Sequence, residues 1–375
     1  MPGRILGDRI QARGADFAHF YSLARLSAAG QLSRFADGDL IRNVQIAVVP
    51  SSEQQWFPPA YGPQVALFLT PLGYLSYEQA LVVWMVATAL VYLLIVRTLV
   101  NRAARLRDFR DIARLAAIAF PPFWSLMLHG QLAVFAALLV TLAYRFLQAG
   151  HTGAAGIALG LMVYKPSLAV PIWAVLLLSG QWVMLLAATL AAIVELGTGI
   201  VAAGPGSLGA YHYMLERSGT FALQLRAQPT ELHSWHNFWL LLLPTHEATA
   251  LVLYALTGTL SIGLAALAWR RTASTAVRFS SLLLATVLAS PHLYTYDLVI
   301  LMPVWLWLTD RFLADRRVPP FVGWVLYAGY AAPLFGFATR VVPVQMSTLC
   351  YAALLAILAA GFLNPVPITS SRQVS

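Results

Sequence analysis

Apolar segments recur along the whole of this 375-residue chain, and they constrain its fold more than any other feature. Hydrophobic residues make up 59% of the chain and charged residues 10%, whereas soluble domains carry about 25% charged residues. Because so few charges cannot cover a water-soluble fold, lipid must cover much of the surface. We therefore predict an all-α polytopic membrane helix bundle of about ten or eleven transmembrane helices, with apolar segments at 77–97, 112–127, 132–147, 153–163, 167–179, 183–203, 247–269, 278–290, 297–311, 318–336 and 344–363.

Two parts of this pattern allow more than one interpretation. Several segments are shorter than the roughly 20 residues that a full span requires. Lys165-Pro166 divides residues 153–179 into either one kinked helix or two short helices that meet at the membrane surface. The segment 64–74 is apolar enough to enter the membrane without crossing it.

The distribution of arginine predicts the orientation. One set of alternate loops and the C-terminal tail hold fourteen of the 24 Lys and Arg residues, and the opposite short loops hold four. The positive-inside bias places the first set in the cytoplasm. The net charge of +9 therefore reflects topology, and we expect no nucleic-acid partner. The chain is predicted to be a multi-pass cell-membrane protein whose polar residues lie on the extracytoplasmic face.

Three regions follow from this topology. Residues 1–63 form an extracytoplasmic N-terminal segment with an acidic motif and an amphipathic surface helix from Phe17 to Ala29. Residues 64–363 form the transmembrane bundle, whose longest outer loop is 204–236. Residues 364–375 form a cytoplasmic tail.

Asp16 lies among aromatic residues in the N-terminal segment. A carboxylate held against apolar surface has a raised proton affinity and can serve as a general base. Asp16 also precedes the expected helix and can act as its N-cap, and the two roles are compatible. We expect His19 and Tyr21 to contact a substrate from the same segment.

Two cationic or titratable residues interrupt apolar segments further along the chain. Lys165 is the only lysine, and it fits either a phosphate contact or a lysine that marks the membrane boundary. His292 follows Pro291 and can donate a hydrogen bond to phosphate, or it can belong to an interfacial aromatic belt. Asp297 opens the next helix as a candidate N-terminal acid.

The remaining candidate substrate contacts are aromatic, imidazole, amide and carboxylate side chains on the same face: His129, Gln131, Tyr164, Trp235, His236, Tyr294 and Asp297. His233 and His236 have a spacing that binds zinc on helices, but no acid completes the set. The sequence contains no phosphate-binding glycine loop and no nucleotide fingerprint. We therefore expect neither a metal nor a cofactor.

Five short motifs follow one another along the chain: Asp16-Phe17-x-x-Phe20-Tyr21, Phe57-Pro58-Pro59, Gly130-Gln131, Tyr164-Lys165-Pro166 and Ser290-Pro291-His292-x-Tyr294-x-x-Asp297. In this order they resemble glycosyltransferase family 87, a family of membrane enzymes in the GT-C superfamily. The resemblance implies a polyprenyl-phosphate-linked sugar as donor, mannose by preference, and inverting transfer to a glycolipid or glycan hydroxyl. It also implies Asp16 as the general base, and it makes Lys165 and His292 the candidates for contact with the lipid phosphate.

Two departures accompany the resemblance. Members of the superfamily usually have a transmembrane helix before the acidic loop, whereas only fifteen residues precede Asp16 here. This difference predicts either an upstream start or the loss of that helix. His129 stands where asparagine is expected.

Two other classes of function fit the sequence. A transporter or lipid flippase also uses broken helices, but it places polar residues near the midplane and at both faces. A non-catalytic membrane scaffold is the third possibility.

Overall fold

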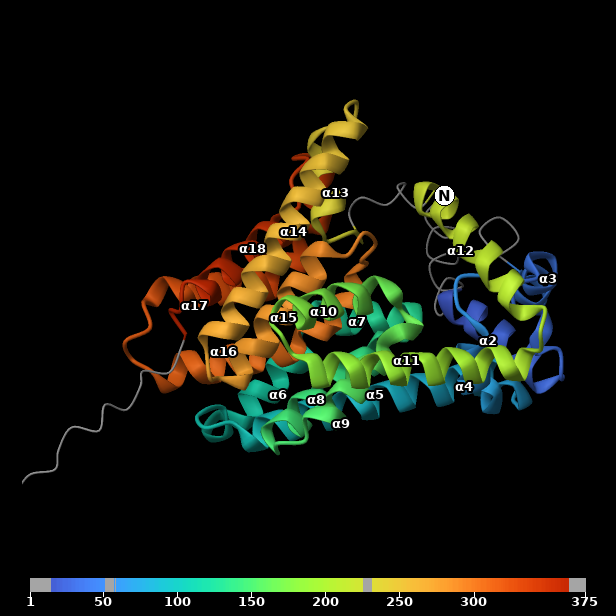
Figure 1. The fold of residues 1–375 in the computed structure, drawn as a ribbon, viewed down its shortest axis with the longest axis horizontal. Coiled ribbons are helices and arrows are strands. Elements are labelled where there is room, and N and C mark those ends of the chain that lie inside the picture. The colour runs from blue at the N-terminus through green and yellow to red at the C-terminus, as the bar shows by residue number, and fades with distance from the viewer. Residues whose placement is uncertain (1–14, 51–56, 58, 225–230, 364–375) are drawn as a thin grey trace, which may run out of the picture.

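The structure is a computed structural model that describes residues 15–50, 57, 59–224 and 231–363 (Figure 1). Within these residues the secondary structure is helical, apart from an isolated antiparallel bridge between Leu232 and Tyr294. The prediction of an all-α membrane bundle is therefore confirmed.

The first half of the chain contains α2 (Ala15–Ala28), η1 (Leu32–Arg34), α3 (Gly38–Val48), α4 (Pro63–Leu69), η3 (Thr70–Tyr74), α5 (Tyr77–Arg102), η4 (Leu106–Phe109), α6 (Arg110–Ile118), α7 (Pro121–His129), α8 (Ala133–Gln148), α9 (Thr152–Gly160), η5 (Leu161–Tyr164) and α10 (Pro166–Leu178). The second half contains α11 (Trp182–Ala203), α12 (Ser207–Gln224), α13 (Trp235–Leu242), α14 (Glu247–Arg271), α15 (Thr275–Ala289), η8 (Thr295–Leu301), α16 (Met302–Ala314), α17 (Pro320–Ala331), η9 (Ala332–Arg340) and α18 (Met346–Ala359).

Each predicted apolar segment corresponds to one of these helices or to a broken pair of them. Proline sets several starts: Pro121, Pro166 and Pro320 begin α7, α10 and α17, where the missing N–H would have no helical partner. Lys165-Pro166 accordingly separates two short helices, α9 with η5 and then α10.

Among the described residues, fewer helices are long enough for a full span than the ten or eleven predicted. Four helices in this part of the chain are long and apolar enough to cross a membrane: α5, α11, α14 and α17 together with η9. The unit formed by η4 with α6 and the following α7, bent by 46°, would make a fifth. Five further described helices are apolar and have 10–17 residues. The 13 residues of α10 reach only about 20 Å, which is less than the roughly 30 Å of a bilayer core.

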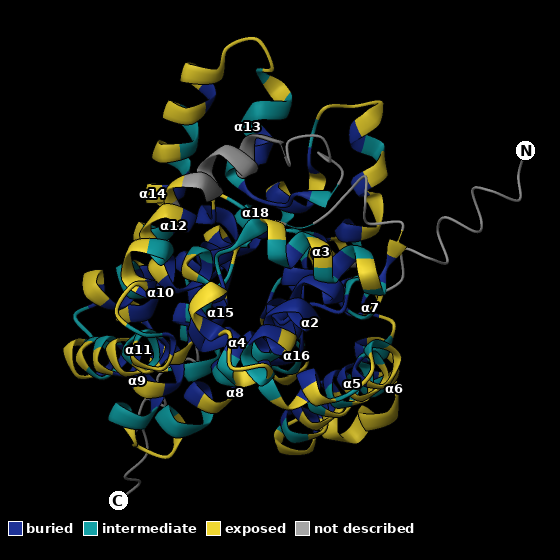
Figure 2. Ribbon diagram, turned by 90° about the vertical axis from the view of Figure 1, so that its right-hand side faces the viewer, coloured by how far each residue is buried: buried dark blue, intermediate teal, exposed yellow. Residues whose placement is uncertain are grey.

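The core lies around α15, whose side chains from Phe279 to Ala289 are all buried. α14, α16 and α18 pack directly against it, and Figure 2 shows the buried residues gathered in this central region. By contrast, α5, α11 and α14 expose large apolar side chains such as Val86, Ile193 and Leu256 on their outer faces. These faces suit contact with lipid.

Two predicted segments have a different structure. The helix expected at the surface from Phe17 to Ala29 is α2, and its side chains from Asp16 to Ala24 are buried against α4, η3 and neighbouring helices. The reason is that apolar residues surround this helix instead of forming one stripe. The outer loop expected at 204–236 contains an 18-residue helix, α12.

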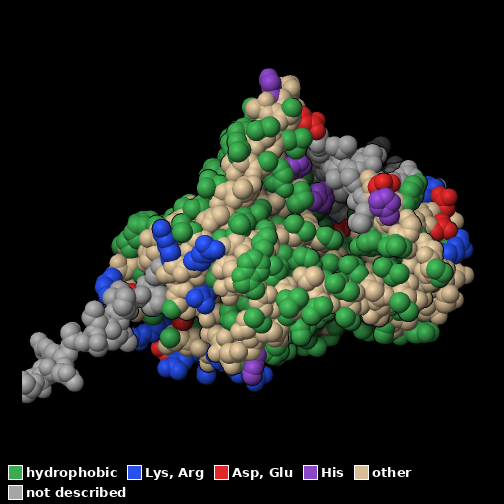
Figure 3. All heavy atoms as spheres, in the orientation of Figure 1, with side chains coloured by type: hydrophobic (Ala, Val, Ile, Leu, Met, Phe, Trp, Pro, Cys, Tyr) green, Lys and Arg blue, Asp and Glu red, His purple; other side chains and the backbone are tan. Residues whose placement is uncertain are grey.

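The molecule has chemically different ends. Figure 3 shows lysine and arginine side chains concentrated at the end of the molecule near α16. The helices α2, α3 and α12 lie at the opposite side of the ribbon in Figure 1.

Candidate functional site

Asp16 occupies the first turn of α2 and is 8% exposed. Its Oδ2 accepts a hydrogen bond from Gln131 Nε2 at 2.6 Å. Asp16 is therefore tied to the turn after α7, and it lies inside the helix instead of at the N-cap position. Burial raises the pKa of this carboxyl group, while the Gln131 hydrogen bond and the charges of His129 and Lys165 act in the opposite direction.

The turn that carries Gln131 depends on Gly130. This glycine caps α7 in the left-handed conformation, with φ 67°, and a Cβ atom there would lie 2.8 Å from the Cβ of Phe17. Its carbonyl oxygen accepts a hydrogen bond from Trp84 Nε1 at 2.8 Å. Glycine thus allows α7 to end against α2, so that Gln131 reaches Asp16.

Lys165 forms an ion pair with Asp297, 132 positions later in the chain. Asp297 is 1% exposed, and its Oδ2 also accepts a hydrogen bond from the backbone N–H of Tyr294 at 3.2 Å. Lys165 Nζ lies 5.4 Å from the centre of the Tyr296 ring. Asp297 therefore serves both as the N-terminal acid of η8 and as the counterion of the only lysine.

An aromatic layer continues from this ion pair to His292. The rings of Tyr294 and Tyr296 stack at 5.2 Å, and the His292 ring meets the Tyr294 ring edge-on at 5.1 Å. The ring centre of His129 lies 5.4 Å from that of Tyr296. Within the described residues, the buried Nε2 of His292 has no hydrogen-bond partner. Burial lowers the pKa of His292 and so favours the neutral form of its ring.

Electrostatic effects link these groups into one cluster. The carboxyl of Asp16 is affected by the charges of Lys165 and Asp297, and the ring of His292 is affected by the same two charges. The structure thus brings together Asp16, Gln131 and His129 near one end of α7 with Lys165, Asp297, Tyr294, Tyr296 and His292. We call this group the Asp16 cluster.

Four other residues predicted to contact a substrate make the following local contacts. Tyr21 donates its hydroxyl hydrogen bond to the Leu75 carbonyl, and Tyr164 donates to the Leu132 carbonyl. Trp235 donates from Nε1 to Ser261 Oγ. His19 is buried between Phe20 and Tyr61, and burial lowers its pKa to about 4.

His236 lies nearer to the cluster. Its ring contacts Tyr254 at 5.1 Å, and its charge acts on His292. His233, the other member of the predicted histidine pair, binds Ser347 and Thr295 instead. In the part of the chain that the structure describes, no group of three or more His, Cys, Asp or Glu residues is placed to hold a metal ion.

Besides Tyr296, two further residues at this site were not predicted. The Tyr61 ring centre lies 6.0 Å from that of His19 and 5.2 Å from that of Phe20, and the charges of Asp16, Lys165 and Asp297 act on its hydroxyl group. Glu231 Oε2 accepts a hydrogen bond from Thr295 Oγ1 at 2.8 Å, and that hydroxyl also bonds His233 Nε2 at 2.9 Å. An acid in an outer loop was the available signal for Glu231, whereas nothing distinguished Tyr61 from other interfacial tyrosines.

Comparison with known proteins identifies the family. The family model of glycosyltransferase family 87 matches residues 60–291, which include Gln131, Lys165 and the helices between them. No curated protein and no solved structure matches the chain. The match covers more than half of the sequence, and the chain therefore belongs to glycosyltransferase family 87.

Proposed function

We propose that this glycosyltransferase transfers a hexose, mannose by preference, from polyprenyl phosphate to a hydroxyl group of a glycolipid or glycan, with inversion at the anomeric carbon. The observation that carries the proposal is the position of Asp16. A buried carboxylate lies in one cluster with the only lysine and with a histidine whose Nε2 has no partner among the described residues.

Asp16 is suited to act on the acceptor. Its raised pKa makes the carboxylate a stronger base than an exposed aspartate, and Gln131 holds it in place. In the proposed step, Asp16 takes the proton of the acceptor hydroxyl while the oxygen attacks the anomeric carbon. The bond from that carbon to the phosphate oxygen breaks, and the polyprenyl phosphate leaves with the electron pair.

Lys165 and His292 are suited to the departing phosphate. The neutral His292 ring can donate one N–H to a phosphate oxygen without carrying charge. Lys165 uses one of its three donors on Asp297 and retains two for other acceptors. Positive charge at the leaving group stabilises the charge that develops as the bond breaks. The base and the phosphate contacts would then lie on opposite sides of the reacting carbon.

The aromatic and imidazole side chains would bind the sugar and the acceptor. Tyr294, Tyr296, His129 and His236 offer ring faces and hydrogen-bonding groups around the cluster. We place this face on the extracytoplasmic side of the cell membrane, because the opposite loops carry most of the arginine.

The test is a transfer assay with purified full-length protein in lipid vesicles. Radiolabelled polyprenyl-phosphate hexoses and glycolipid acceptors would be supplied, with nucleotide sugars as the alternative donors. We expect a labelled glycolipid only from the polyprenyl-phosphate donors. Product from nucleotide sugars alone would contradict the donor class. Movement of donor across the vesicle membrane without product would indicate a flippase.

A further inference from the structure

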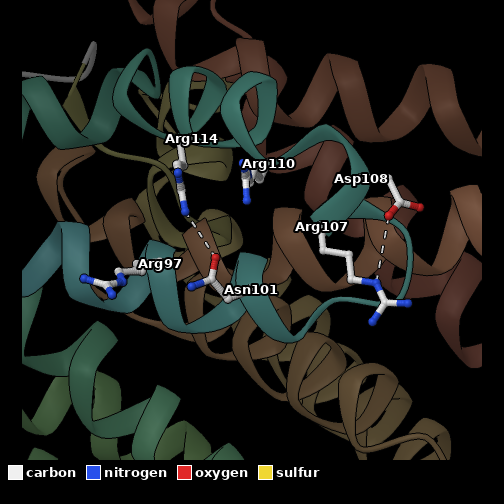
Figure 4. Close-up of a pocket in the computed structure, with 6 residues that line it drawn as sticks. All are labelled: Arg97, Asn101, Arg107, Asp108, Arg110 and Arg114. Atoms are coloured by element: carbon white, nitrogen blue, oxygen red, sulfur yellow. Dashed lines mark hydrogen bonds and ion pairs between the residues drawn. The ribbon is translucent and has the colours of Figure 1, made fainter.

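A second polar site lies among α5, η4 and α6, away from the Asp16 cluster. An open hollow of about 620 Å³ is lined by Arg97, Asn101, Arg107, Asp108, Arg110 and Arg114. In Figure 4, Arg110 and Arg114 point from α6 toward Asn101 on α5. Four guanidinium groups with one lining carboxylate make this hollow strongly positive. It is therefore suited to an anion.

Two of the four arginines have no acidic partner in the described part of the chain. Arg107 lies 3.9 Å from Asp108, and Arg114 bonds Asn101 Oδ1 at 3.1 Å. Arg114 also pairs with Asp111, which is not among the lining residues. By contrast, Arg97 and Arg110 form no ion pair with any described acid, and both are exposed. Their guanidinium groups retain donors for a ligand, and the planar fork of such donors matches phosphate oxygens.

The turn that carries the hollow is held by the rest of the bundle. The backbone N–H groups of Ala104, Arg105 and Leu106 donate to the carboxylate of Asp310 on α16, at 2.7–3.0 Å. These bonds fix η4 and the start of α6 relative to the end of α5. The arginines are therefore presented on a fixed framework, which limits the conformational cost of binding an anion.

The surroundings of the hollow favour a lipid as the source of that anion. Phe109, Ile112 and Leu115 lie in the same short segment as Arg110 and Arg114, and these three apolar side chains are 53–68% exposed. In a membrane protein, such side chains face the acyl region while the neighbouring arginines face the headgroups. Basic pockets between membrane helices are known to bind acidic headgroups.

We propose that this arginine hollow binds the phosphate of an anionic phospholipid headgroup at the arginine-rich end of the bundle. Arginine residues that only determine topology need to lie on one side of the membrane. Topology alone does not require that they surround one hollow, or that two of them lack an acidic partner among the described residues. The site is separate from the transfer reaction and does not depend on the donor.

Native mass spectrometry of the delipidated full-length protein in detergent would test this. The lipid probes are dioleoylphosphatidylglycerol and, as a zwitterionic control, dioleoylphosphatidylcholine. The test variant is Arg97→Gln/Arg110→Gln, which removes the two unpaired charges. The matched control is Arg270→Gln/Arg271→Gln, which removes two exposed charges from the end of α14. In a separate experiment, the unfolding temperature is measured with inorganic phosphate alone, to distinguish free phosphate from a lipid headgroup.

We expect the wild type and the control pair to bind the anionic lipid equally, and the test variant to bind it about tenfold more weakly. We expect phosphatidylcholine to bind weakly to all three proteins. Equal anionic-lipid binding by the two variants would overturn the proposal. If millimolar inorganic phosphate raised the unfolding temperature of the wild type but not of the test variant, the ligand would be free phosphate. That result would contradict the proposal that a lipid headgroup supplies the phosphate.

Discussion

Gln131 donates a 2.6 Å hydrogen bond to Asp16, and this bond joins two segments 115 positions apart. It connects the buried first turn of α2 to the glycine turn after α7. The bond stabilises the charged form of Asp16, whereas burial destabilises that form. The balance between the two sets the proton affinity of the proposed base.

Replacing Asp16 by asparagine should strongly reduce transfer and leave the fold intact. Asparagine retains an oxygen that accepts the Gln131 hydrogen bond, but it cannot take the acceptor proton. We expect kcat to fall about 10²–10⁴-fold, measured with a radiolabelled polyprenyl-phosphate hexose. The matched control is Glu78→Gln, which changes a carboxylate in the first turn of α5. Normal turnover by the Asp16 variant would remove the proposed base.

The pH dependence of transfer should follow Asp16. Since the base is active only when deprotonated, kcat/KM should rise with pH through the raised pKa of Asp16 and then level off. The Gln131→Ala variant loses the hydrogen bond that lowers this pKa. Its acidic limb should therefore move to higher pH. The exposed Gln148→Ala serves as the control, and an unshifted limb in Gln131→Ala would contradict this role.

The ionisation of Asp16 should affect stability in the direction opposite to its effect on transfer: stability should fall as pH rises. A carboxyl group whose folded-state pKa is raised binds its proton more tightly in the folded protein than in the unfolded chain. Its favourable contribution is therefore complete below its usual pKa of 3.8 and is lost as pH rises through the folded value. Because asparagine does not ionise, the Asp16→Asn variant does not lose this stability as pH rises. Thermal unfolding at neutral pH should consequently show it to be at least as stable as the wild type.

The sequence reveals most of the fold because lipid-facing helices need long apolar segments. It also distinguishes Asp16, Lys165 and His292 as candidate site residues, since charged or titratable residues are conspicuous beside such segments. By contrast, the ion pair between Lys165 and Asp297 could not be predicted from the sequence. It depends on the way η5 and η8 approach each other, and neither local periodicity nor spacing contains that information.

The burial of α2 was not predictable for a related reason. Its sequence combines Asp16 and His19 with aromatic residues, which is also typical of a helix at the membrane surface. Packing by α4 and η3 decides the outcome, and those elements lie more than thirty positions away. Tyr61 was not predicted as a site residue because only the folded chain brings the charges of other residues near it.

Gly130→Ala should impair both stability and transfer. The left-handed φ of 67° costs an alanine about 1–2 kcal/mol, and its Cβ would also collide with Phe17, the neighbour of Asp16. Gly150→Ala is a matched control, because Gly150 has φ 81° and no atom within 4 Å of the added Cβ. Chemical denaturation should show the larger loss for Gly130→Ala, and only this variant should lose activity. Equal losses in stability would mean that the contact with Phe17 is unimportant.

The ion pair between Lys165 and Asp297 offers a test by compensation. Lys165→Met would leave Asp297, 1% exposed, without its counterion, and breaking a buried pair in this way costs about 3–5 kcal/mol. The double variant Lys165→Met/Asp297→Asn removes both charges and should recover most of that loss in thermal unfolding. Transfer should stay low in the double variant, since the proposed phosphate contact is still missing. Recovery of transfer together with stability would show that Lys165 acts only through the fold.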